Sequence, residues 1–185
     1  AGARRTTLLS AVTNFKYTGL TAPCSSFPCP SARRTKKEFA YDVYGNVSIE
    51  TDSGDLDIVG DEKVIAHYYA PNTSAYIVGL TGVTQVLFPA GTIQQQVVNA
   101  YDQATWWDTP PTKGAVTKRY DWLKEQNRLV ASTFGYDTYG NPTSSTDATN
   151  RTVNVSYDAT VRLYPISTTN GANETTATTW DYLCG

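Results

Sequence analysis

The heptapeptide YDVYGNV at residues 41–47 recurs almost unchanged as YDTYGNP at residues 136–142. Weaker copies of its leading pair, an aspartate directly after an aromatic residue, stand at Tyr101-Asp102, Tyr120-Asp121, Tyr157-Asp158 and Trp180-Asp181. From Tyr101 onward, and with Tyr136 of the second heptapeptide included, successive copies are 19, 16, 21 and 23 residues apart. A period of about 20 residues is typical of one hairpin-like unit that is stacked repeatedly along a chain.

Four positions of the heptapeptide suit a turn between two strands. The aspartate can accept hydrogen bonds from backbone N–H groups about two residues further on, where the strand has ended. The glycine and the following asparagine tolerate the positive φ angles that a tight reversal needs, and the tyrosine brings a large ring with a polar tip. We therefore assign the repeat turn to Tyr41, Asp42, Gly45, Asn46, Tyr136, Asp137, Gly140 and Asn141.

The composition favours strands over helices. The chain has 13 Tyr, 4 Trp and 5 Phe and lacks Met, and strand formers of this kind dominate its apolar residues. From Glu38 onward, short strand-like runs alternate with Gly, Asn, Asp and Pro turn signals about every ten residues. The sequence predicts an all-β fold of stacked antiparallel hairpins, because a single hairpin is only marginally stable in water.

We expect one continuous domain with two regions. Residues 1–37 are expected to hold N-terminal strands, a Cys/Pro-rich loop and a basic connector, and residues 38–185 the repeat sheet. Within the loop, Cys24 and Cys29 are expected to form a local disulfide, and Cys184 is left free or pairs with another chain. Zinc is the alternative, but it wants four ligands and the chain offers three Cys and the single His67.

Charge and hydropathy limit the partners. The formal net charge is -2, and the 15 basic residues are dispersed rather than gathered on one stripe, so no nucleic-acid partner is expected. No stretch approaches the 18 apolar residues of a membrane-spanning helix, so no membrane span is expected. Because the chain begins at Ala1 without an initiator Met, we expect a processed product or an excised piece.

From about Phe39 to its end, the chain resembles the YD-repeat sequences of bacterial Rhs proteins and of the B and C components of insecticidal toxin complexes. Besides the two heptapeptides, residues 67–80 are similar to the segment that links one YD unit to the next in these proteins. The resemblance implies a secreted or cell-surface protein whose large β-sheet spirals into a hollow shell around a toxic polypeptide. The implied partners are copies of the chain itself, flanking YD-repeat segments and an encapsulated toxin.

The chain differs from that family in two respects, and both limit the function that we expect. Its shells hold many more repeats than this chain, and the aspartyl-protease-like self-cleaving site of the family has no matching motif here. We therefore expect either a wall segment of such a shell or a short relative that assembles with copies of itself.

The residues offer few candidates for chemistry, and we expect neither an enzyme nor a cofactor. His67, the only histidine, lies in a strand-like run without a nucleophile motif and is expected to be structural. The acidic run at residues 52–62 is a weak calcium candidate, but it lacks EF-hand spacing because Ala66 stands where the bidentate Glu belongs. Its carboxylates are Asp52, Asp55, Asp57 and Asp61, and a solvated hairpin turn is the main prediction there.

The leading hypothesis is a structural, non-enzymatic β-repeat protein of an extracellular shell or of a self-assembling fibre or tube. A wall segment of a toxin-encapsulating cocoon is the first alternative. The second is a module that binds carbohydrate or a cell surface through its Trp and Tyr side chains. Trp106 and Trp107 could stack on a sugar ring, although they also suit packing over a sheet edge. Paired carboxylates for glycoside hydrolysis are left open, since only their separation in space would reveal them.

Overall fold

The computed structural model describes residues 7–16, 32–88 and 91–182 and confirms the all-β prediction. Its longest helical element among the described residues is the 3-10 turn η2 (Lys124–Gln126), which is far too short to span a membrane. The strands are β1 (Ala11–Lys16), β2 (Arg33–Tyr41), β3 (Val47–Asp55), β4 (Lys63–Tyr69), β5 (Thr81–Phe88), β6 (Thr92–Tyr101), β7 (Val116–Leu123), β8 (Arg128–Tyr136), β9 (Pro142–Thr146), β10 (Thr152–Tyr157), β11 (Pro165–Thr169) and β12 (Thr175–Ala177).

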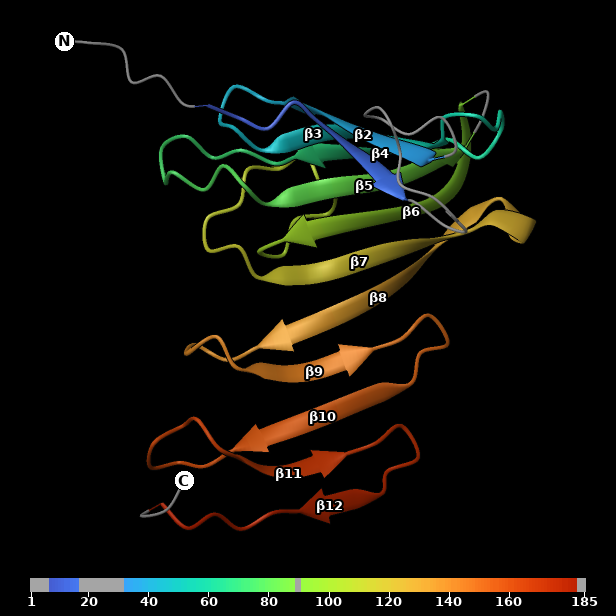
Figure 1. The fold of residues 1–185 in the computed structure, drawn as a ribbon. Helices are drawn as coiled ribbons and strands as arrows, with labels where there is room; N and C mark the ends of the chain where they lie inside the picture. The colour runs from blue at the N-terminus through green and yellow to red at the C-terminus, as the bar shows by residue number, and fades with distance from the viewer. Residues whose placement is uncertain (1–6, 17–31, 89–90, 183–185) are drawn as a thin grey trace, which may run out of the picture. The chain divides into compact units, whose positions relative to one another are not determined.

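The strands form one 12-stranded sheet in which each strand is hydrogen-bonded to the next one in sequence (Figure 1). Neighbours run antiparallel, so the sheet is a meander of successive hairpins. The order starts at β1 and stops at β12 without a pairing that joins these two, and the sheet is therefore open rather than closed.

The chain divides into two compact units, one formed by the residues up to Tyr69 with Val83–Gln96, and the other by Ala70–Gly82 with the residues from Val97 onward. The basic run that was expected in a connector up to residue 37 belongs instead to β2, within the first unit. There its side chains face acidic residues of β3: Lys37 Nζ lies 2.5 Å from Glu50 Oε1, and Arg33 Nε lies 2.9 Å from Asp55 Oδ2. Opposite charges across neighbouring strands stabilise a sheet, which is why these basic residues extend the strand.

The best-packed part of the second unit lies at the end of β6. Val98 and Ala100 are fully buried there, and Tyr101 is almost so. The loop at residues 102–115 packs onto the sheet at Gly82 of β5, where a Cβ atom would stand only 2.5 Å from Cε3 of Trp107. The missing side chain of Gly82 therefore makes room for the indole.

The last hairpins of this unit have almost no core. From residue 142 to residue 182, the only buried residue is Asp158. Cross-strand hydrogen bonds hold these strands together, among them the bonds between the Thr146 and Thr152 hydroxyls and between the Thr169 and Thr175 hydroxyls, each 2.8 Å long. Hydrogen bonds, rather than buried apolar side chains, are therefore the main contacts between these strands.

Candidate functional site

Six aromatic side chains hold the open ends of six hairpins, each made of an odd-numbered strand and the even-numbered strand that follows it. These hairpins are β1–β2, β3–β4, β5–β6, β7–β8, β9–β10 and β11–β12. Each lies at or just after the end of an even-numbered strand and donates a hydrogen bond to a backbone carbonyl at or near the start of the preceding strand, and we call these residues the aromatic latches. The latches are Tyr41 (to Leu9, 2.6 Å), Tyr69 (to Val47, 2.8 Å), Tyr101 (to Thr81, 2.9 Å), Tyr136 (to Val116, 2.9 Å), Tyr157 (to Pro142, 3.1 Å) and Trp180 (to Pro165, 2.7 Å).

The geometry of a latch explains the aromatic residue of the repeat. A hairpin is held at one end by its own turn, while its other end is free to fray. A long, rigid side chain with a donor at its tip reaches across this open end to a backbone carbonyl of the other strand. Two rotatable bonds limit the entropy that tyrosine loses in making this contact.

The aspartate after a latch organises the turn into the next hairpin. Asp42 Oδ1 accepts hydrogen bonds from the backbone N–H groups of Tyr44 and Asn46, both at 2.9 Å, and its Oδ2 accepts one from Asn46 Nδ2 at 2.9 Å. Two backbone bonds complete the turn, from Asp42 N to Asn46 O and from Gly45 N to Asp42 O. The turn that begins at Asp137 repeats this arrangement, with side-chain bonds of 2.8 to 2.9 Å.

The same five-residue turn also closes two hairpins at their other end. One begins at Asp147, between β9 and β10, and the other at Asn170, between β11 and β12; each accepts N–H groups two and four residues on. Asn150 and Asn173, both with a φ of 63°, stand where the heptapeptides have glycines with φ of 90° and 88°. Neither turn was predicted from the sequence, because neither has an aromatic residue before it or a glycine at its fourth position. An Asp or Asn followed three residues later by Asn is the signal that identifies them.

Two further aspartates after latches anchor longer loops. The carboxylate of Asp102 accepts four backbone N–H groups, from residues 112–115, at 2.7 to 3.0 Å. The carboxylate of Asp158 accepts four, from Thr160, Val161, Leu163 and Tyr164, at 2.7 to 3.1 Å. Each carboxylate therefore supplies the acceptors for a stretch of backbone that has no strand partner.

These backbone donors set the acidity of the carboxylates. Burial alone would raise the pKa of Asp158, but the N–H groups of Val161, Tyr164 and their neighbours outweigh it and lower the pKa from 3.8 to about 2. The pKa values of Asp42, Asp102 and Asp137 are lowered from 3.8 in the same way, against a raising effect of burial. All four carboxylates are therefore charged at neutral pH and bound to the backbone.

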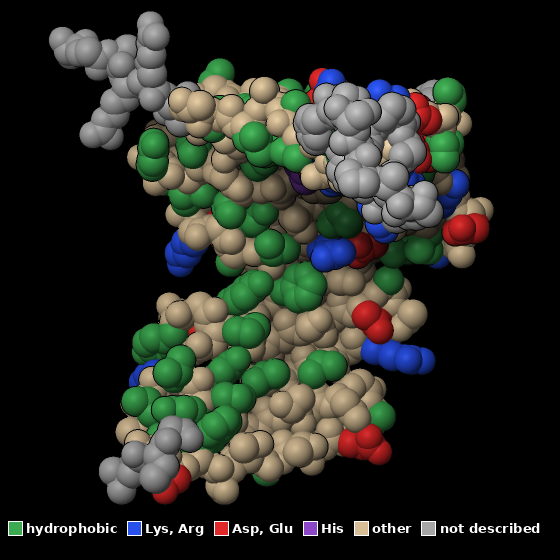
Figure 2. Space-filling model, in the orientation of Figure 1, with side chains coloured by type: hydrophobic (Ala, Val, Ile, Leu, Met, Phe, Trp, Pro, Cys, Tyr) green, Lys and Arg blue, Asp and Glu red, His purple; other side chains and the backbone are tan. Residues whose placement is uncertain are grey.

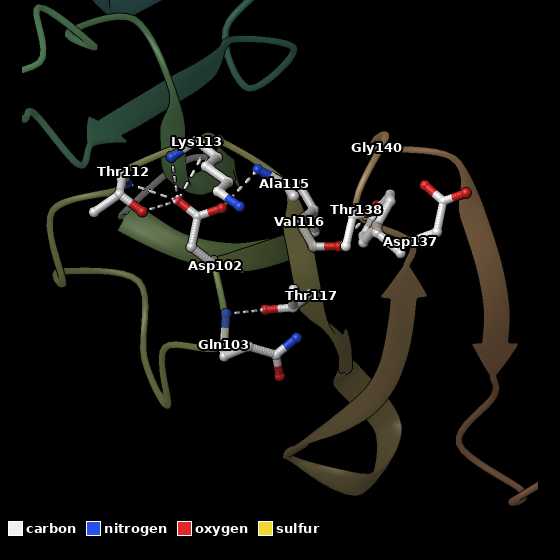
Figure 3. A pocket seen from close by; sticks show the side chains of 12 residues that line it. Asp102, Gln103, Thr112, Lys113, Ala115, Val116, Thr117, Asp137, Thr138 and Gly140 are labelled. Atoms are coloured by element: carbon white, nitrogen blue, oxygen red, sulfur yellow. Dashed lines mark hydrogen bonds between the residues drawn. The ribbon is translucent and has the colours of Figure 1, made fainter. Parts of the chain in front are cut away.

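A groove of about 670 Å³ runs between the turns after β6 and after β8 in the second unit (Figure 3). Asp102 and Asp137 line it, together with the hydroxyls of Thr112, Thr117 and Thr138. A glycosidase needs one carboxylic acid with a raised pKa beside a second carboxylate. The lowered pKa values of Asp102 and Asp137 make this pair unsuited to that role, and their oxygens already bind backbone N–H groups.

No protein-family model and no curated protein matches the chain. The resemblance to YD-repeat proteins thus rests on the motifs themselves and stays a prediction.

One predicted copy of the repeat has a different role. Tyr120 and Asp121 lie inside β7 rather than at a strand end. The Tyr120 hydroxyl donates to the Thr105 carbonyl at 3.3 Å, and the Asp121 carboxylate pairs with Arg119 at 2.8 Å. Conversely, Tyr69 is a latch although Ala70 follows it, so the sequence pair alone did not reveal it.

The acidic run does not gather its carboxylates around one point. Asp52 lies 3.5 Å from Lys37 and 3.7 Å from Lys63, and Asp55 and Asp57 pair with the two arginines at the start of β2. Asp61 accepts the N–H of Asp55 through Oδ2 at 2.9 Å, and its buried Oδ1 has no hydrogen-bond partner. Within the described ranges, no three His, Cys, Asp or Glu side chains are placed to hold a metal ion.

His67, Trp106 and Trp107 each contact a neighbouring residue. His67 Nδ1 is 3.2 Å from the Thr84 hydroxyl within the first unit. Trp106 packs edge-on against Tyr120 at 5.2 Å between ring centroids, and Trp107 covers Gly82. Cys24, Cys29 and Cys184 lie outside the described residues. An aromatic cluster that the sequence analysis did not single out joins Tyr164 to Trp180 and Tyr182, at centroid distances of 5.1 and 5.4 Å.

Proposed function

We propose that the chain is a structural, non-enzymatic β-repeat protein that forms part of an extracellular shell or of a self-assembling fibre or tube. One observation carries the proposal: an aromatic latch recurs at all six hairpins. Regular repetition of one stabilising contact along a sheet is typical of repeat proteins, whose units depend on their neighbours for stability.

The chemistry of the repeat supports the same function. Its charged side chains bind backbone N–H groups, as Asp102 does with residues 112–115, and its aromatic hydroxyls bind backbone carbonyls. These side chains stabilise turns and hairpin ends, and a turn whose donors are satisfied does not depend on a hydrophobic core. This suits a thin wall with both faces partly exposed, such as the sheet from β9 to β12.

A wall segment of a toxin-encapsulating cocoon is the alternative form of the proposal, and it rests on the family resemblance. The two forms differ in the partner: the fibre or tube needs only copies of the chain, whereas the cocoon needs flanking repeats and a toxic polypeptide. In both forms the protein is secreted or exposed on the cell surface.

Sedimentation velocity and glycan-array binding on the same purified protein test the proposal. Assembly that increases with protein concentration, without saturable glycan binding, is the expected result. A monomer at every concentration that binds one glycan class saturably would replace the structural proposal with a carbohydrate-binding module. A monomer that assembles only when mixed with flanking YD-repeat segments would favour the cocoon wall.

A further inference from the structure

The last strand of the second unit, β12, offers an unused set of backbone hydrogen-bonding groups. Among the described residues it pairs with β11 alone, and all three of its residues are exposed. Thr178 N donates to Ile166 O, and Asn170 N donates to Glu174 O, so the even-numbered residues 174, 176 and 178 face β11. Because donors alternate along an antiparallel strand, Thr175 and Ala177 direct their N–H and C=O groups away from the sheet.

An exposed apolar patch adjoins this edge. Figure 2 shows hydrophobic side chains gathered over the C-terminal hairpins. The exposed apolar side chains of these hairpins include Trp180, which is 37% exposed, and Val161, Leu163, Ile166 and Tyr182; the rings of Trp180 and Tyr182 both pack against Tyr164. In contrast, the latch Tyr101 inside the sheet is only 5% exposed. The last latch therefore lacks the cover that a latch in the interior of the sheet has.

β12 is a short edge strand of three residues, but it lacks the other protections of a sheet edge. Natural edge strands are blunted by charged residues, by proline or by a bulge. The stretch TTATTW at residues 175–180 holds neither a charge nor a proline. An uncharged, exposed edge beside an apolar patch is a surface on which another strand can pair.

The first strand of the chain has the complementary features. Among the described residues, β1 pairs with β2 alone, and Phe39 N donates to Ser10 O, so Ala11 and Thr13 direct their backbone groups away from β2. Leu8 and Leu9, just before β1, are 41% and 57% exposed. They lie at the latched end of the first hairpin, since the Leu9 carbonyl accepts the bond from Tyr41.

We propose that β12 of one copy of the chain pairs antiparallel with β1 of a second copy, so that the meander continues from copy to copy. With Ala177 opposite Ala11, the register places Leu8 opposite Trp180 and so covers the exposed patch. This contact repeats, between copies, the antiparallel contact that joins each hairpin to the next within the chain. It joins two different surfaces head to tail, and such a contact builds an open filament unless its rotation closes a ring. The inference rests on the proposed structural function and names the surfaces that perform it.

Two variants block one surface each. Ala177→Pro removes the outward N–H of β12 but none of its bonds to β11. Ala177→Val, which keeps the N–H, is its control. The double variant Leu8→Ser with Leu9→Ser removes the apolar side chains before β1. Its control is Val43→Ser with Val59→Ser, because those valines are 91% and 96% exposed elsewhere in the first unit.

Light scattering measures the mass of each protein in solution. We expect wild-type and control proteins to grow beyond the 20.2 kDa of the chain as concentration rises, and both blocked variants to stay at that mass. An equal mixture of the two blocked variants retains one intact pair of surfaces, so its mass should double and rise no further. Should Ala177→Pro fail to fold, as circular dichroism would show, the leucine variant and its control decide between the outcomes.

The possible failures are distinguishable. If wild-type protein assembles and the blocked variants assemble equally well, the proposed pairing of β12 with β1 is wrong and the structural function stands. If the mixture stays at the mass of one chain, the contact does not join these two different surfaces, and the inference is overturned. If wild-type protein never exceeds the mass of one chain, self-assembly itself is refuted.

Discussion

The hydroxyl of Tyr136 donates a 2.9 Å hydrogen bond to the carbonyl oxygen of Val116, 20 residues earlier in the chain. It joins the end of β8 to the start of β7, which are the two open ends of one hairpin. Because the same bond recurs in every hairpin, its removal at a single position measures what one latch contributes to the sheet.

Tyr136→Phe keeps the ring and removes the latch donor. We expect the free energy of unfolding to fall by about 0.5–1.5 kcal/mol, the usual net value of such a bond. Urea titration followed by circular dichroism measures the change. Tyr76→Phe is the matched control, because Tyr76 is 83% exposed. Equal stability of the two variants would mean that the latch contributes nothing.

Acid should weaken the second unit through Asp158. The pKa of this carboxyl falls from 3.8 to about 2 on folding, so its contribution to stability is fully present above pH 3.8. As the pH falls from 3.8 towards 2, the unfolded chain takes up the proton first, and this contribution is lost. Thermal unfolding at several pH values should show a steeper loss over this range for wild type than for Asp158→Asn. Parallel curves for the two proteins would refute this role.

The fourth position of the five-residue turn should accept asparagine but not a branched side chain. Gly140 has a φ of 88°, and Asn150 and Asn173 occupy the same position of their turns at 63°. Gly140→Asn should therefore leave the urea midpoint nearly unchanged, whereas Gly140→Val should reduce the free energy of unfolding by about 1–2 kcal/mol. Equal effects of both substitutions would show that the left-handed conformation is not required there.

Gly82→Ala should displace the loop that carries Trp107. The new Cβ atom would stand 2.5 Å from Cε3 of Trp107, and the overlap should cost about 1–3 kcal/mol of unfolding free energy. Near-ultraviolet circular dichroism should report the movement of the indole. Adding Trp107→Leu should recover part of the loss, because the smaller side chain leaves room for the methyl group. No change in the spectrum of Gly82→Ala would contradict the packing.

Much of the fold was readable from the sequence because its repeat unit is local. Tyr-Asp pairs, glycines and asparagines lie within a few residues of one another, and their turn chemistry does not depend on distant parts of the chain. The all-β class and the succession of hairpins followed from this local chemistry. The turns at Asp147 and Asn170 escaped notice because asparagine replaces glycine in them.

The latches were harder to predict, because their partners lie far away in sequence. Tyr69 and Tyr120 show the difficulty: the first is a latch without an aspartate after it, and the second has the aspartate but lies inside β7. Which role a tyrosine takes depends on where its strand ends, and neighbouring strands decide that. The basic run of β2 was misplaced for a similar reason, since the carboxylates that pair with it belong to β3 and the loop after it.

Electron microscopy of the native, unmodified protein tests the central claim most directly, namely that the latched repeat builds an ordered assembly. The account predicts filaments or tubes of uniform width that form from the 20.2 kDa chain alone. Dispersed single chains at every concentration examined would contradict it.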